Sequence, residues 1–264
     1  MTDLRPDAPS HLPFRDQEAT GPDNGAPVVL LHGFGGDRQT WLNIQTALAS
    51  KKRSIAFDLP GHGEALDWPR IGNAGVSAKA VGQSLEALEL TKVHLVGHSM
   101  GGAVAALIAL RNPDLVASLT LLAPGGFGSE INHRLLRRYA AATDADTMET
   151  LLEQFFGWEF KLPKFLARTA AESRARPGAA ATLEAIADEI IDGSVQKTLP
   201  RDELAALPMP IKVLWGTQDR VLPTRQAHKL PGVVATHIFE RTGHMLHLEL
   251  PKEVTRLILQ NAGC

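Results

Sequence analysis

Residues 93–102 have the sequence VHLVGHSMGG, the most informative stretch of the chain. An apolar run leads into a serine flanked by glycines, and an alanine-rich segment, residues 103–110, follows. This order predicts a strand, a sharp turn and a helix, the arrangement called a nucleophile elbow. The glycines let the two backbones pass closely, so the turn holds Ser99 exposed in a strained conformation. Gly-x-Ser-x-Gly is common by chance, but its place between a strand and an alanine-rich helix favours a nucleophile.

A serine nucleophile needs a base, and the base needs a group that orients it. In this architecture the acid and then the histidine come later in the chain. Asp219 follows one predicted strand in the turn GTQD, and His244 follows the next strand in the turn TGHM. His247 is the alternative base, but it falls in an expected helical turn, whereas His244 after Gly243 fits a loop tip. We therefore predict a catalytic triad of Ser99, Asp219 and His244.

Acyl chemistry also requires N–H donors for the developing oxyanion. The residue after the nucleophile, Met100, supplies one donor. The second is expected from the early loop HGFGG, residues 32–36, with the N–H of Phe34 as the candidate. The same glycines suggest a dinucleotide fingerprint, but Arg38 stands where its last glycine belongs. The loop is therefore predicted to form an oxyanion hole.

Short apolar runs recur along the chain and read as buried strands. They occupy residues 28–31, 54–57, 93–96, 119–122, 211–215 and 236–239. Continuous apolar runs are typical of a parallel sheet that helices cover on both faces. Ligands bind such sheets outside the carboxyl ends of the strands. Most of the runs are followed by glycine-rich or proline-containing turns, so the chemistry is predicted at that edge.

From about residue 125 to residue 205 the strand signals stop. Apolar residues then follow helical spacing at Met148, Leu151, Leu152, Phe155 and Phe156. We predict a helical lid over 125–205, a polar leader over 1–26 and an α/β core over 27–124 and 206–264. Residues expected to contact the substrate are Phe34, Met100, Phe127 and Phe155. The alternative is that the lid aromatics form the core of the lid.

Composition narrows the function further. The 264 residues include 27 basic and 29 acidic side chains, a formal charge of −2. This balance does not favour nucleic acid or an anionic membrane as partner, so a small-molecule acyl substrate is expected, with a homo-oligomer possible. The longest apolar run considered, residues 103–110, is far shorter than the ~18 residues that cross a bilayer. Cys264 is the only cysteine and the N-terminal residues lack signal-peptide features, which predicts a cytoplasmic protein.

The motifs HGFGG, DLPGHG, GHSMGG, GTQD and TGHM, in this order, resemble the α/β-hydrolase superfamily. The resemblance implies a mostly parallel sheet of about eight strands, a helical cap between strands six and seven, and the triad and oxyanion residues named above. Within the superfamily, SLTLLAPGGFGSEIN resembles the hydrolase-type domain of the dihydrolipoamide acetyltransferase component of acetoin dehydrogenase systems.

The predicted function is a serine hydrolase that cleaves a small ester, thioester or related acyl compound through an acyl-enzyme, without metal or organic cofactor. One alternative is an acyltransferase or a non-catalytic component of an acetoin dehydrogenase-type complex. Against it, no histidine begins a His-x-x-x-Asp-Gly motif, and a short polar leader stands where such components carry a lipoyl domain. A carbon–carbon bond hydrolase is the other alternative, although Met245 stands where these enzymes typically have tryptophan.

Overall fold

The computed structural model describes residues 9–22 and 25–264. Within this part of the chain, seven strands form one sheet in the order β1-β3-β2-β4-β5-β8-β9. Their bounds are β1 Phe14–Gln17, β2 Val28–Leu31, β3 Ser54–Phe57, β4 Val93–His98, β5 Val116–Leu122, β8 Ile211–Gly216 and β9 Val234–Phe239. Strand β1 is antiparallel to β3, and the other neighbouring pairs are parallel. The expected α/β-hydrolase architecture is therefore confirmed.

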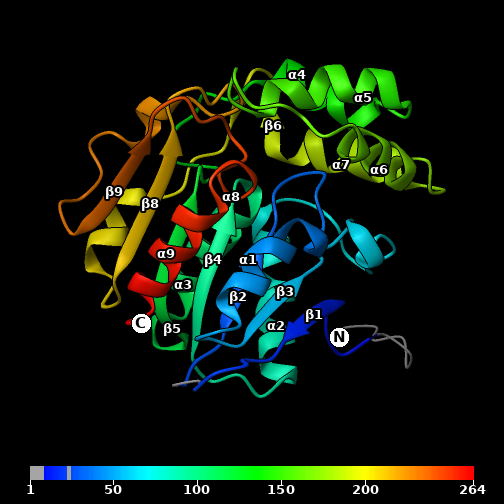
Figure 1. Ribbon diagram of the computed structural model, residues 1–264. Coiled ribbons are helices and arrows are strands. Elements are labelled where there is room, and N and C mark those ends of the chain that lie inside the picture. The colour runs from blue at the N-terminus through cyan, green and yellow to red at the C-terminus, as the bar shows by residue number, and fades with distance from the viewer. Residues whose placement is uncertain (1–8, 23–24) are drawn as a thin grey trace.

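Helices cover both faces of the sheet. Right-handed crossovers place α1 on one face and α2 on the other, because the chain reverses direction across the sheet after β3. Helix α9 packs beside α1, and α3 packs beside α2 (Figure 1). The helices of the core are α1 Leu42–Leu48, α2 Ala74–Ala87, α3 Met100–Arg111, α8 Leu246–Glu249 and α9 Pro251–Asn261. Central strands β2 and β4 are buried along their whole length, as expected for parallel strands covered on both faces.

The insertion between β5 and β8 lies over the carboxyl ends of the strands (Figure 1). Its helices are α4 His133–Ala141, α5 Ala145–Leu152, α6 Lys164–Arg174 and α7 Ala179–Ile190. The segment is not entirely helical, because β6 Ile191–Asp192 and β7 Val195–Gln196 form a hairpin. Its two turn residues are Gly193 and Ser194; Gly193 has a φ of 60°, and glycine at the first turn position is a sequence signal for such a turn. Short 3₁₀ helices occupy Arg38–Trp41, Gly63–Ala65, Pro113–Leu115, Glu153–Phe155, Arg201–Ala206 and Thr224–Ala227.

Two expectations about the order of elements need correction. The described chain has seven strands in the main sheet where about eight were expected, and the lid follows the fifth strand where the sixth was expected. The reason is that only β1 precedes β2 in the described residues. Part of the expected polar leader, residues 1–26, also belongs to the core: Leu12 is buried, and its N–H donates to the Ser84 hydroxyl over 2.9 Å. Residues 1–8 and 23–24 of the leader lie outside the described part.

Among the described residues, none of the helices combines the length and the apolar character needed to traverse a bilayer.

Candidate active site

Ser99 lies at the predicted elbow between β4 and α3. Its backbone has φ 52° and ψ −117°, a conformation that is costly for a residue with a side chain. The two flanking glycines make the turn possible. A Cβ at Gly97 would lie 2.2 Å from the carbonyl oxygen of Gly101, and one at Gly101 would lie 2.3 Å from that of Leu31. The Gly-x-Ser-x-Gly spacing therefore reflects close backbone packing around the serine.

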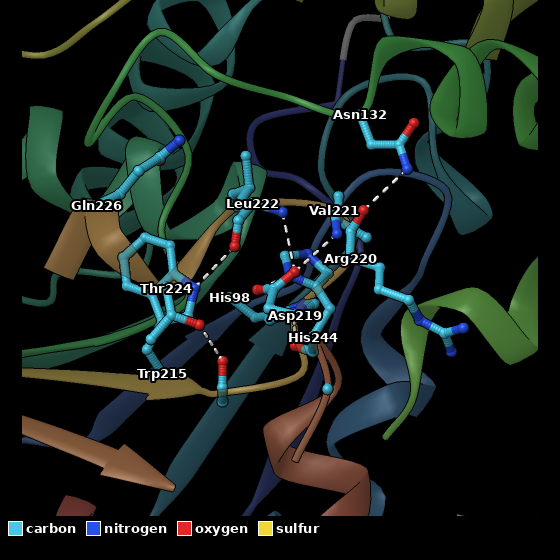
Figure 2. A network of polar contacts seen from close by, with 12 residues as sticks. His98, Asn132, Trp215, Asp219, Arg220, Val221, Leu222, Thr224, Gln226 and His244 are labelled. Atoms are coloured by element: carbon cyan, nitrogen blue, oxygen red, sulfur yellow. Dashed lines mark hydrogen bonds and ion pairs between the residues drawn. The ribbon is translucent and has the colours of Figure 1, made fainter. Parts of the chain in front are cut away.

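Asp219 and His244 meet on two adjacent loops, after β8 and β9. Nδ1 of His244 donates to Oδ2 of Asp219 over 2.7 Å, and the side chains are 2% and 0% exposed. The other carboxylate oxygen accepts the N–H groups of Val221 at 2.8 Å and Leu222 at 2.9 Å. Figure 2 shows the carboxylate between these donors and the imidazole. The buried acid is thus held in one orientation, and it fixes the orientation of the histidine ring.

The elbow and the histidine loop are in direct contact through His98, the residue before Ser99. Nε2 of His98 donates to the carbonyl oxygen of His244 over 2.9 Å, and the two ring centroids are 4.7 Å apart. Within the described residues, the Ser99 hydroxyl makes no hydrogen bond to His244. Such bonds commonly tighten only when substrate is bound. The observed contact between the elbow and the histidine loop is therefore made by His98, the neighbour of the serine.

His247, the rival base, has a different position. Its Nε2 lies 2.8 Å from Oγ1 of Thr40, and its ring centroid is 4.6 Å from that of Trp41. Burial lowers the pKa of His247 to about 3, so the ring is neutral near pH 7. The structure therefore pairs Asp219 with His244, as the sequence predicted, and uses His247 as part of the core.

The oxyanion loop, residues 32–36, approaches the elbow closely. A Cβ at Gly33 would lie 3.1 Å from Cβ of Ser99. The backbone N–H of Phe34 has no acceptor among the described residues, and that of Met100 is one of the unpaired donors at the start of α3. Both predicted donors are therefore available beside the serine.

Two buried histidines hold this loop in place. His32 donates from Nδ1 to the Gly33 carbonyl at 2.8 Å and accepts the Leu59 N–H at Nε2 over 2.9 Å. His62 accepts the Gly35 N–H at Nε2 over 3.1 Å. Burial lowers the pKa of both rings, that of His62 to about 3, which keeps the accepting nitrogens unprotonated. His62 was not singled out from the sequence, because its partner Gly35 lies in a different loop.

A cavity of about 250 Å³ opens beside the serine, and its wall includes Ser99, Phe34 and Met100. Phe34 and Met100 were predicted to contact substrate. The other two predicted residues, Phe127 and Phe155, are not part of the described wall of this cavity.

The positions of these two aromatics have a clear cause. Phe127 is 1% exposed and packs in the core with its ring centroid 6.4 Å from that of Trp215. Phe155 packs on Tyr139, with ring centroids 5.0 Å apart, and contributes its carbonyl oxygen to the His244 N–H at 2.7 Å. Phe127 is thus a core residue, and Phe155 supports the histidine loop; their contact with substrate stays a prediction.

Two charged residues fasten the lid to the catalytic loops, and neither was predicted as part of the site. Arg220, beside the acid, donates from Nη2 to the carbonyl oxygens of Glu153 and Phe156. Glu249 accepts the N–H groups of Gly157 at 2.9 Å and Gly243 at 3.0 Å. Burial raises the pKa of this carboxyl above its usual value. These contacts join parts of the chain that are distant in sequence, so local patterns do not indicate them.

In the ranges 9–22 and 25–264, no group of three or more His, Cys, Asp or Glu side chains is arranged to hold a metal ion.

Comparison with known proteins now identifies the family. The model of the alpha/beta hydrolase family matches residues 28–257. The chain belongs to the alpha/beta hydrolase family. Its fold agrees with that of other alpha/beta hydrolases: a meta-cleavage product hydrolase from Pseudomonas fluorescens superimposes with a TM-score of 0.83, at 22% identity, over 95% of this chain and 93% of that one.

Two curated proteins show what this alpha/beta hydrolase is similar to in sequence. The dihydrolipoyllysine-residue acetyltransferase component of the acetoin cleaving system of Pseudomonas putida is 34% identical over 239 residues, which is 90% of this chain and 64% of that protein. The chain therefore spans less than two thirds of the length of that relative. Monoacylglycerol lipase abhd6-B of Xenopus laevis is 27% identical over 259 residues, 90% of this chain and 75% of that protein.

Proposed function

We propose that this alpha/beta hydrolase cleaves carboxylic esters or thioesters of small molecules through an acyl-enzyme formed on Ser99. The observation that supports the proposal is a strained, glycine-flanked serine whose neighbour His98 contacts the loop of a buried carboxylate–imidazole pair. Each part has a defined task in acyl transfer.

The reaction follows from the positions of these groups. The Ser99 oxygen attacks the carbonyl carbon while Nε2 of His244 takes the hydroxyl proton. Asp219 stabilises the imidazolium that forms. The same proton then passes to the departing alcohol or thiol, which leaves an ester on Ser99. In the second half, His244 takes a proton from water, the hydroxide attacks the acyl carbon, and the proton returns to Ser99 as the acid departs.

The oxyanion of each tetrahedral intermediate has two donors in reach of the serine, the N–H groups of Phe34 and Met100. Loss of one such donor typically costs about 3–4 kcal/mol of transition-state stabilisation. The neutral rings of His32 and His62 keep the Phe34 loop in position. This support is consistent with a loop that must hold its geometry during turnover.

Transfer of the acyl group to a thiol is the second candidate, and the observation that favours it is the 34% identity to the acetoin-system acetyltransferase component. The chemistry differs in one step only, because a thiol takes the place of water in the attack on the acyl-enzyme. Both candidates use the same Ser99, His244 and Asp219.

The test uses a panel of p-nitrophenyl esters and acyl-coenzyme A thioesters, together with a fluorophosphonate probe and intact-protein mass. The native protein is expected to hydrolyse members of the panel and to gain one probe mass. Ser99→Ala should lower kcat by about 10⁴ to 10⁶-fold and abolish labelling. Ser50→Ala, a change at an exposed serine, is the control and should behave as native. Added dihydrolipoamide or coenzyme A distinguishes transfer from hydrolysis by the product formed.

An unlabelled native protein, or equal turnover by Ser99→Ala, would contradict the proposal.

A further inference from the structure

The cavity beside Ser99 runs along the length of α3. Its wall includes Ser99, Ala103 and Leu107, which are spaced by four residues and so lie in a row on one face of the helix. With a rise of 1.5 Å per residue, Ala103 lies about 6 Å and Leu107 about 12 Å beyond Ser99 along the helix axis.

The start of α2 forms the far end of the cavity. Asn73 and Gly75 line it there, and a Cβ at Gly75 would lie 3.7 Å from the guanidinium of Arg111, the last residue of α3. The space therefore extends from the first residue of α3 toward its last turn. Ser99, Ala103 and Leu107 thus mark a path along this wall from the serine.

Much of the cavity wall is apolar. Leu136 and Ile190 of the lid line it, as do Val221 and Leu222 of the core. Gln196 also lines it, but its side-chain amide already binds backbone groups of residues 126, 128 and 130. An occupant beside this apolar wall gains free energy by removing apolar surface from water and has little to bind by hydrogen bonds.

Polar groups gather at the far end. The side-chain amide of Asn73 donates to Oε2 of Glu189 over 3.4 Å, which joins the core to the lid. Glu189 and Lys197 line this end and are exposed. The far end of the cavity therefore meets solvent.

The cavity is placed for the acyl part of a substrate. Phe34 and Met100, whose N–H groups would bind the oxyanion, line it, whereas His244, which must protonate the leaving group, is not among its lining residues. The leaving alcohol or thiol has to depart on the side of the imidazole. The group that stays on Ser99 is the one that extends along α3.

We propose that Ala103 and Leu107 determine the length of acyl chain that the site accepts. The site then selects esters or thioesters of straight-chain fatty acids of about eight to ten carbons. An extended chain advances about 1.25 Å per carbon, so the 12 Å between Ser99 and Leu107 accommodate this length. The cavity volume of about 250 Å³ is consistent with an acyl chain longer than six carbons, because a cavity of ~150 Å³ already holds the six carbons of benzene. This inference rests on the proposed serine hydrolase function.

The test compares kcat/KM for p-nitrophenyl esters from acetate to tetradecanoate. For the native protein the value should rise by up to about fourfold for each methylene added, reach its highest level near eight to ten carbons, and gain nothing from further methylenes, which extend into solvent. Ala103→Leu fills the cavity about 6 Å from the nucleophile, and it should move the maximum to about four carbons and lower the decanoate-to-acetate ratio at least 100-fold. Leu107→Trp fills the far end and should move the maximum by only one or two carbons.

Two matched controls make the same substitutions away from the cavity. Ala87→Leu alters an exposed residue at the end of α2, and Leu110→Trp alters a half-buried residue of α3 that is not a lining residue. Both should keep the native chain-length profile. Thermal melting and the rate of fluorophosphonate labelling establish that each variant is folded with a reactive serine.

The outcomes separate this inference from the proposed function. If the folded native protein hydrolyses none of the esters and takes up no probe, the serine hydrolase proposal fails. A native enzyme that is active but has a flat profile overturns the inference alone. So does a labelled, folded Ala103→Leu or Leu107→Trp variant whose profile matches that of its control.

Discussion

His244 Nδ1 lies 2.7 Å from Asp219 Oδ2, and neither side chain is more than 2% exposed. The carboxylate is itself held by two backbone N–H groups, so the orientation of the ring is set by the loop after β8. Asp219→Asn keeps the shape of this site but offers an amide to the ring, which disfavours the tautomer with a free Nε2. We expect kcat for the best ester to fall about 10⁴-fold with KM little changed. Steady-state kinetics measure this, and a loss below tenfold would contradict the role given to Asp219.

The hydrogen bond from the Gly35 N–H to His62 leads to a prediction about the oxyanion loop. His62→Phe removes the acceptor and lets the Phe34 N–H shift. A misplacement of this kind costs about 100-fold in kcat. His62→Gln offers a carbonyl oxygen in place of Nε2 and should recover a large part of the loss, which a general loss of stability would not explain. Equal kcat in the Phe and Gln variants, with both folded by circular dichroism, would count against the positioning role.

Buried neutral histidines make stability depend on pH. Burial lowers the pKa of His62 and of His247 to about 3 in the fold, whereas histidine in an unfolded chain titrates near ~6.5. Below ~6.5 the unfolded chain binds protons that the native state does not. The free energy of unfolding is therefore fully present above pH ~6.5 and falls by about 1.4 kcal/mol per pH unit for each ring as pH approaches 3.

For this pair the loss between pH 7 and pH 5 is about 4 kcal/mol, and His62→Gln should remove about half of it. Urea unfolding at the two pH values measures the difference for native and variant proteins. The same pH dependence in both proteins would show that His62 does not contribute it.

Two helical glycines are expected to respond oppositely to alanine. A Cβ at Gly82 in α2 meets no heavy atom within 4 Å, and alanine there should raise the free energy of unfolding by about 1 kcal/mol. At Gly101 in α3 the methyl group would lie 2.3 Å from the Leu31 carbonyl oxygen. This overlap should lower the free energy of unfolding by about 3 kcal/mol. Urea unfolding of both variants is the measurement. A stabilised Gly101→Ala protein would contradict the close packing at the elbow.

The features predicted well from the sequence are those that short segments encode. Ser99 lies in a local strand–turn–helix pattern, and Asp219 and His244 each follow a strand in a recognisable turn. Strands β8 and β9 are neighbours in the sheet, so the pairing of Asp219 with His244 follows from topology.

Features that depend on contacts across the chain were not predictable in this way. Phe127 and Phe155 had the right residue type for a substrate wall, but packing against Trp215 and Tyr139 decides where they lie. Ala103 and Leu107 carried a usable signal, since they follow Ser99 at helical spacing on one face.

Next to Asp219 and His244 the lid is fastened through its main-chain atoms: Arg220 binds two of its carbonyl oxygens, and Glu249 binds one of its amides. Most substitutions leave these main-chain atoms in place. Lid side chains that line the cavity can therefore change while Asp219 and His244 keep their positions. New preferences for acyl groups are therefore accessible by single substitutions in α4 or α7, at little risk to the chemistry itself.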